Sequence, residues 1–246
     1  MKEENKNIGL PVLVLTIGLG IVVLFTWLFS ELSEMLIEEE LQGFDSRITL
    51  FFDRSASPAL DTFYTIVTEL GSVEFLAAAS IILILFLWFK MKDIWGIMLF
   101  SAALGGGGIL TAVMKESYER NRPSINEAVD ATGFSFPSGH AVGSLIFYGF
   151  VAYLIVRSSR QKGFKIWVLV LSVILILLIG ASRIYLGAHF PSDIVAGYTV
   201  GTIWLILCLM VLEWIEWQSN SDVRPVHTMR KILGAIYKKS REKFKR

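Results

Sequence analysis

The sequence has few of the residues that build a water-exposed surface or a disulfide framework. Charged residues make up only 18% of the 246 positions, against about 25% in an ordinary soluble domain. The single cysteine, Cys208, lies in an apolar stretch, so the chain can form neither an internal disulfide nor a cysteine-ligated metal site. The formal net charge of +1 identifies no acidic partner, and no nucleic-acid partner is expected.

Long apolar stretches take the place of the missing charge. Hydrophobic residues reach 54%, the mean hydropathy is +0.58, and a membrane helix needs about 20 such residues in a row. Six stretches are candidate spans, although 76–89, 141–156 and 166–180 fall short of that length. The six are 10–29, 76–89, 94–114, 141–156, 166–180 and 194–214. We therefore predict an all-α polytopic membrane protein, a bundle of six transmembrane helices with short interfacial helices in the outer loops.

The first stretch could also be read as a secretory signal peptide. Its apolar block is longer than the usual core of about 7–15 residues, and no clear cleavage site follows it. We therefore favour a retained anchor, which places one membrane domain over 1–222. This domain includes a mixed-charge outer segment, 31–71, whose role the sequence does not reveal.

The basic residues predict the orientation of the spans. If both termini are cytoplasmic, only six of the 23 lysines and arginines lie outside, as the positive-inside rule requires. These six are Arg47, Arg54, Lys115, Arg120, Arg122 and Arg183. A basic tail, 223–246, carries apolar residues at helical spacing, which indicates either a helix lying on anionic lipid or a frayed basic end.

Four of the outer basic residues lie within two short loops, 115–140 and 182–193. These loops hold KESYERNRP at 115–123, PSGH at 137–140 and SRIYLGAHFPSD at 182–193. Lys115, Arg122 and Arg183 would be costly beside hydrocarbon unless an anion paired with them, and the arginine fork matches phosphate oxygens. The sequence therefore predicts an outward-facing phosphate site.

The PSGH block adds a helix terminus to this site. Ser138 stands where a helix cap is expected, directly before the fourth span. The backbone N–H groups of Gly139 and His140 would then point outward without intrahelical partners, which favours anion binding.

Two of the three histidines fall in these blocks and can supply a nucleophile and an acid. Asp193 follows His189 by four residues and would reach one imidazole nitrogen if that stretch is helical, although Pro191 could delay the helix start. Within the first block, Glu119, Arg120 and Asn121 are interpreted as a solvated loop. The glycine run 105–108 is interpreted as a close helix contact.

Together the three blocks resemble the type 2 phosphatidic acid phosphatase family, with its patterns Lys-x6-Arg-Pro, Pro-Ser-Gly-His and Ser-Arg-x5-His-x3-Asp. The resemblance implies that His189 attacks phosphorus to form a phosphohistidine, that Asp193 orients it and that His140 protonates the leaving oxygen. It also implies hydrolysis without a metal or other cofactor. The residues that would hold the phosphoryl oxygens are Lys115, Arg122, Ser138, Gly139 and Arg183.

The outward site favours a lipid substrate presented at the outer leaflet. We predict hydrolysis of undecaprenyl pyrophosphate, with phosphatidylglycerophosphate or phosphatidate as the alternative. A non-hydrolytic lipid flippase or scaffold on the same fold is a second class, disfavoured by the intact His189, His140 and Asp193. Vanadium haloperoxidases resemble the phosphate site but are soluble, and the six spans argue against them. The sequence does not indicate an oligomeric state.

Overall fold

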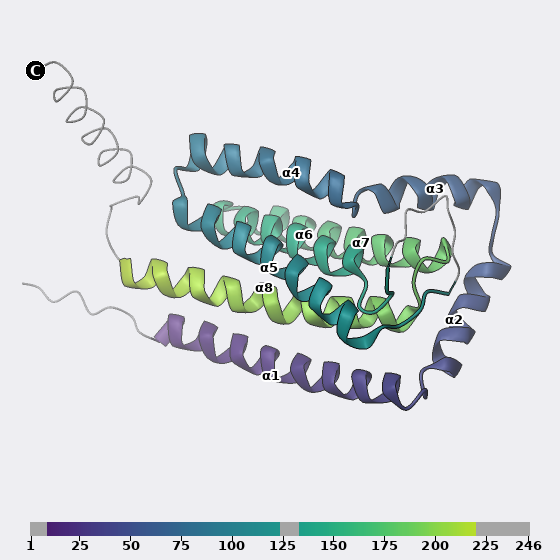
Figure 1. The fold of residues 1–246 in the computed structure, drawn as a ribbon. Helices are drawn as coiled ribbons and strands as arrows, with labels where there is room; N and C mark the ends of the chain where they lie inside the picture. The colour runs from purple at the N-terminus through teal and green to yellow at the C-terminus, as the bar shows by residue number, and fades with distance from the viewer. Residues whose placement is uncertain (1–8, 124–132, 220–246) are drawn as a thin grey trace, which may run out of the picture.

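The protein is described here by a computed structural model, which covers residues 9–123 and 133–219. Every regular element in these two ranges is a helix (Figure 1). The helices are α1 (Gly9–Ile37), α2 (Gln42–Arg54), α3 (Pro58–Glu69), α4 (Val73–Phe86), the π-helical turn η1 (Leu87–Met91), α5 (Ile94–Tyr118), α6 (Gly139–Ser158), α7 (Lys162–Tyr185) and α8 (Pro191–Ser219). The predicted all-α fold is confirmed.

Six segments of the described chain are long and apolar enough to cross a membrane, as predicted. Their limits differ from the predicted ranges, mainly because several helices continue past the charged residue at which the predicted span ends, as α5 does past Lys115 and α6 past Arg157. The first helix runs to Ile37 and so takes in the start of the segment assigned to the outer side. Likewise, Lys115 lies in the last turn of α5 and Arg183 in the last turn of α7, so both belong to helices rather than to loops.

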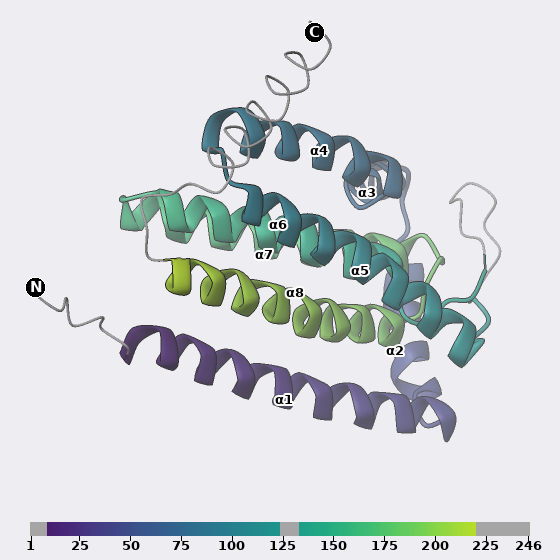
Figure 2. The same ribbon diagram turned by 60° about the vertical axis from the view of Figure 1, so that its left-hand side comes forward.

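Helix α8 occupies the centre of the bundle. It packs against α1, α5 and α6, while α6 also contacts α4 and α7 (Figures 1 and 2). The first and last described residues lie at one end of the bundle, and the α5–α6 and α7–α8 connections lie at the other (Figure 1). The three sequence blocks therefore share one end. The predicted basic tail, 223–246, lies outside the described residues.

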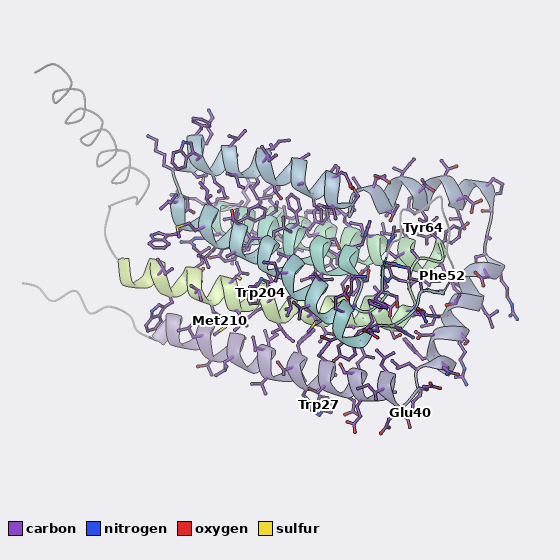
Figure 3. All side chains as sticks on the ribbon, in the orientation of Figure 1. Trp27, Glu40, Phe52, Tyr64, Trp204 and Met210 are labelled. Atoms are coloured by element: carbon purple, nitrogen blue, oxygen red, sulfur yellow. The ribbon has the colours of Figure 1, made fainter. Side chains whose placement is uncertain are left out.

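The interior of the bundle is held by rings packed against small residues. Phe100 of α5 stacks edge-on against Phe150 of α6, with ring centroids 5.3 Å apart, and both are buried. A Cβ on Gly106 would lie 2.4 Å from the ring of Trp204 on α8, the residue labelled in Figure 3. A Cβ on Gly107 would come equally close to Ile146. The predicted helix contact at 105–108 is therefore real at these two positions, where backbones approach closely.

The outer segment forms two short helices, as predicted. The side chain of Ser57 caps α3 by accepting the backbone N–H of Leu60, and Pro58 occupies the first turn. Phe52 of α2 and Tyr64 of α3, both labelled in Figure 3, pack around Tyr185 at the end of α7. This aromatic cluster fixes α2 and α3 onto the end of the bundle that carries the sequence blocks.

Candidate functional site

His189 lies in the tight connection between α7 and α8. Gly187 adopts a positive φ of 68°, a conformation that glycine reaches without strain. The chain then folds back, so that the backbone N–H groups of Ala188 and His189 both donate to the carbonyl of Arg183, at 3.0 and 3.2 Å. The turn therefore presents the imidazole directly beside the arginine that ends α7.

Asp193 holds this imidazole from the first turn of α8. Its Oδ2 lies 3.3 Å from His189 Nδ1 and also accepts the backbone N–H of Phe190 at 2.9 Å. The predicted four-residue pairing is therefore formed, although the helix begins only at Pro191, a favoured first position for proline. Asp193 is completely buried, so its carboxylate is directed at these partners rather than at solvent.

The other imidazole nitrogen faces Arg122. Nη1 of Arg122 lies 3.1 Å from Nε2 of His189, and a guanidinium group can only donate a hydrogen bond. The hydrogen-bond network therefore assigns the lone pair to Nε2 and the proton to Nδ1, which faces Asp193. Arg122 also donates to the carbonyls of Ala188, Gly133 and Phe134, which fix its position next to the ring.

Burial determines the protonation state of His189. Its side chain is only 3% exposed, and this desolvation lowers its pKa to about 4, outweighing the opposing effect of Asp193. Burial likewise lowers the pKa of Arg122, although the neighbouring Asp193 raises it. At neutral pH His189 is therefore a neutral base with its lone pair on Nε2.

Two more cations approach the same point from α5 and α7. Lys115 donates a hydrogen bond to the carbonyl of Phe134. Arg183 is 4% exposed and donates from Nη1 to Thr68 Oγ1 at 2.9 Å. Among the described residues its Nε is one of two buried side-chain polar atoms with no hydrogen-bond partner. A buried donor without a partner is unfavourable, and an anion bound beside it would remove that penalty.

The start of α6 completes the set of predicted residues. Ser138 is the N-cap, as predicted, and its Oγ accepts the backbone N–H of Ala141 at 3.4 Å. Gly139 and His140 form the first helical positions, whose N–H groups have no acceptor within the helix. His140 lies within electrostatic range of His189 and of the cations Lys115, Arg122 and Arg183. The structure thus brings all three sequence blocks together at one end of the bundle.

Besides Thr68, the partner of Arg183, two further side chains belong to this network and were not predicted. Arg120, expected in a solvated loop, is instead ion-paired with Asp193 at 2.5 Å and with Asp45 of α2 at 2.6 Å, so that interpretation is wrong. Asp45 lay in a mixed-charge segment without any recognisable motif. An ion pair joining positions 75 residues apart leaves no signal in local spacing.

A cavity of about 390 Å³ leads from the site into the bundle. Lys115, Gly139 and His140 line its outer part, and Leu76, Leu104 and Ile146 line it further along α4, α5 and α6. Its walls are mainly apolar, and Gly108 and Gly143 widen it by lacking side chains. A polar mouth and an apolar depth suit an amphiphilic molecule.

Two imidazoles among cations, one of them oriented by Asp193, at one end of an apolar helical bundle, are the arrangement of an integral membrane phosphatase. Residues 94–217 match the family described as the PAP2 superfamily, and the chain belongs to this family. The predicted family resemblance is therefore confirmed, as is the assignment to the lipid phosphatase class of hydrolases.

Two known proteins and one solved structure illustrate the similarity. Phosphatidylglycerophosphatase B of Bacillus subtilis is 32% identical over 61% of this chain and 74% of its own length. An undecaprenyl-diphosphatase of Sulfolobus acidocaldarius is 29% identical over 41% of each chain. The crystal structure of a transmembrane PAP2 type phosphatidylglycerolphosphate phosphatase from Bacillus subtilis superposes with a TM-score of 0.73 at 28% identity, covering 79% of this chain and 96% of the other.

Proposed function

We propose that the protein hydrolyses a membrane lipid phosphate through a phosphohistidine formed at His189. The observation that carries this proposal is the orientation of one imidazole between two opposite charges. The Nδ1–H group of His189 donates to Asp193, and the Nε2 lone pair points toward Arg122, one of the cations that would bind the phosphoryl group. A neutral, oriented nucleophile beside an anion site is what covalent phosphoryl transfer requires.

In the first step, Nε2 of His189 bonds to phosphorus while the bond from phosphorus to the lipid oxygen breaks. His140 gives a proton to the leaving oxygen. The negative charge of the bound phosphate offsets the nearby cations Arg183, Arg122 and Lys115 and so favours the protonated imidazole that this step requires. The phosphoryl oxygens lie against Lys115, Arg122, Arg183 and the N-terminus of α6, with Ser138 and Gly139 shaping that terminus. Positive charge that develops on His189 is balanced by Asp193, which remains ionised.

In the second step, water attacks the phosphohistidine and gives a proton to His140. The bond between phosphorus and nitrogen then breaks, which releases inorganic phosphate and returns His189 to its neutral form. The proton balance closes, because His140 donates one proton and later recovers one. Trapping an acid-labile phosphoenzyme after rapid quenching of labelled substrate tests this intermediate, and its absence from a working enzyme would exclude it.

The cavity supports a lipid as the carrier of the phosphate. A headgroup bound near Lys115 and His140 would leave its chain beside Leu76, Leu104 and Ile146, so the chain need not leave an apolar environment. Water-soluble phosphate esters lack this contribution. We therefore expect a much lower KM for long-chain substrates than for short-chain analogues.

Phosphatidylglycerophosphate is the substrate that we propose first, and undecaprenyl pyrophosphate second. This order reverses the sequence-based preference. The reason is that a 32% identical relative and a structure with a TM-score of 0.73 both bear names for phosphatidylglycerophosphate hydrolysis, whereas the undecaprenyl-diphosphatase match covers less of either chain.

The substrate assignment is tested by phosphate release from purified protein in mixed micelles, with a chelator present throughout. Phosphatidylglycerophosphate, undecaprenyl pyrophosphate and phosphatidate are offered at equal surface concentration. The proposal expects chelator-resistant turnover, fastest with phosphatidylglycerophosphate. Faster release from undecaprenyl pyrophosphate would restore the sequence-based order, and no release from any of the three would overturn the proposed function.

We also propose that the site faces the extracytoplasmic side, with both termini cytoplasmic. The support is the positive-inside bias together with the position of the blocks at the end opposite the first and last described residues. Serines at two helix ends offer matched probes: Ser55 beyond α2 and Ser158 at the end of α6, both exposed. In intact cells a membrane-impermeant thiol reagent should label Ser55→Cys and not Ser158→Cys. The buried Cys208 provides the unlabelled background, and the opposite pattern would reverse the orientation.

A further inference from the structure

Asp45 is an unusual residue for an outer helix. It is the one buried residue of α2, at 2% exposed, while the large apolar side chains Phe44, Leu50 and Phe51 of the same helix are exposed. Burying a carboxylate is unfavourable unless it is paired and hydrogen-bonded. Asp45 satisfies both conditions. Among the described residues, its carboxylate bonds to Arg120 and Ser192, which belong to the first and third sequence blocks.

The first set of contacts fixes the start of α8. Asp45 Oδ1 accepts the backbone N–H of Ser192 at 2.9 Å, and Oδ2 accepts the Ser192 hydroxyl at 2.7 Å. An anion at this helix terminus satisfies an N–H group that has no intrahelical acceptor. Asp193 is the next residue. Through Ser192, a side chain of α2 therefore fixes the first turn of α8, which carries the Asp193 carboxylate.

The second contact passes through Arg120. Its guanidinium bridges two carboxylates, with Nη2 2.6 Å from Asp45 Oδ2 and Nη1 2.5 Å from Asp193 Oδ1. Nη1 also donates to Ser192 Oγ at 2.8 Å, and the guanidinium carbon lies 4.3 Å from the centre of the Phe190 ring. Arg120 is therefore held from several sides and cannot turn away from Asp193 without losing these contacts.

The charges of Asp45, Arg120 and Asp193 act in turn on the imidazole of His189. His189 already faces the cations Arg122 and Arg183, with Asp193 as the carboxylate in direct contact and His140 nearby on α6. Arg120 adds one more cation on the far side of Asp193. Asp45 balances that cation, so that the charge of Asp193 remains available to an imidazole that becomes positive when Nε2 bonds to phosphorus.

From these contacts we propose that Asp45 is a positioning residue for catalysis, acting through Arg120 and Ser192 to fix and charge-balance the Asp193 carboxylate that orients His189. The proposal rests on the proposed function, since it assigns Asp45 to the same phosphoryl transfer. It also explains why α2, a short helix outside the three blocks, is docked onto the outer end of the bundle. Asp45 itself touches neither the nucleophile nor the phosphate site.

The first test replaces Asp45 with asparagine in the full-length protein and uses Asp53→Asn as the matched control. Asp53 is an exposed aspartate of the same helix. With the lipid that the wild type hydrolyses, Asp45→Asn should lower kcat by about 10–100-fold, by analogy with the loss of hydrogen-bonded partners behind metal-ligating residues. KM should change by less than about threefold. Asp53→Asn should match the wild type in both constants.

The second test uses the sign of the charge, which a purely structural contact would not follow. Asp45→Asn leaves Arg120 less balanced, so the acidic limb of kcat/KM should move to lower pH. Arg120→Gln removes a cation beside Asp193, so the limb should move to higher pH. The double variant should be no less active than the less active of the two single variants, because both substitutions act on one network.

These outcomes separate the inference from the proposed function. A wild type that is inactive on every lipid offered would contradict the proposed function. An active wild type with Asp45→Asn equal to Asp53→Asn in kcat and pH profile would overturn the role of Asp45 alone. If Asp45→Asn does not fold, Arg120→Gln and Arg120→Lys carry the test, and an acidic limb at the wild-type position in both would also overturn it.

Discussion

Helices α5, α6 and α8 meet in two different ways along their length. Inside the bundle they touch through rings and glycines, such as Phe100 against Phe150 and Trp204 against Gly106. At the end that carries the three sequence blocks, charged groups meet instead. Arg120 lies between two carboxylates, and Lys115 lies near Arg122. The buried rings of the interior already pack against their neighbours, whereas the charged end has a buried donor, Arg183 Nε, without a hydrogen-bond partner.

This difference teaches where stability and activity reside. Close packing of small residues and rings holds helices together in a membrane, where apolar surface gains little by leaving lipid. Buried cations contribute to activity, through the anion that they bind, rather than to stability. Substitutions at the end that carries the sequence blocks should therefore lower turnover with little change in stability. Substitutions inside the bundle should lower stability with little change in turnover.

The largest effect is expected at the nucleophile. His189→Ala removes the proposed nucleophile, so kcat should fall at least about 10⁴-fold. Thermal unfolding in detergent should remain close to that of the wild type. Retained biological activity with abolished phosphate release would favour the flippase or scaffold alternative, and retained phosphate release would exclude His189 as the nucleophile.

The next largest effect is expected at Arg183. Arg183→Gln removes a buried donor and a positive charge from the anion site, so kcat/KM should fall by about 10²–10³-fold. Arg183→Lys keeps the charge but loses the planar fork, and should recover only part of this loss. Arg54→Gln, at an exposed arginine of α2, is the matched control and should leave the rate unchanged. Equal rates for Arg183→Gln and Arg54→Gln would remove Arg183 from the site.

A smaller effect is expected from pH, and its sign follows from burial. The pKa of His189 is lowered to about 4, so the imidazole remains an active neutral base well below the ordinary value of about 6.5. The acidic limb of kcat/KM should therefore lie near pH 4, with a tenfold loss per unit below it. The same shift reduces folding stability as pH falls from about 6.5 to 4, because the unfolded chain binds the proton first.

Rates measured across this range must therefore refer to the folded fraction, which circular dichroism gives at each pH. A short-chain substrate with a separately titrated phosphate removes the ionisation of the lipid from the profile. An acidic limb at pH 6.5 or above would contradict a buried, desolvated nucleophile. Asp193→Asn is the control. Its acidic limb should move to lower pH, because the Asp193 carboxylate raises the pKa of His189 while burial lowers it.

The sequence predicted the six spans and the residues of the three blocks, because both depend on local signals. A run of apolar residues marks a span wherever it occurs, and His189 and Asp193 are close enough in sequence for their pairing to follow from spacing. Arg120, Thr68 and Asp45 were not predicted, since their roles arise only when helices far apart in sequence meet. Arg120 was misread as solvated because an arginine in a loop usually is, and its two buried carboxylate partners lie 73 and 75 residues away.

The smallest effect on turnover is expected inside the bundle, at Gly106. A methyl group there would lie 2.4 Å from the Trp204 ring, whose indole N–H donates to the carbonyl of Ala103 at 2.9 Å, so Gly106→Ala must displace the ring and weaken that bond. Overpacking of this kind typically destabilises by about 1–3 kcal/mol. Gly105→Ala is the matched control, because a methyl group on Gly105 would meet nothing within 4 Å. Thermal unfolding should show a lower midpoint for Gly106→Ala alone, while kcat per folded molecule stays within about twofold for both, since the outer charges are untouched. A Gly106→Ala protein of normal stability but low kcat would contradict the assignment of stability to the interior and of turnover to the charged end. It would mean that interior packing acts directly on the distant imidazoles.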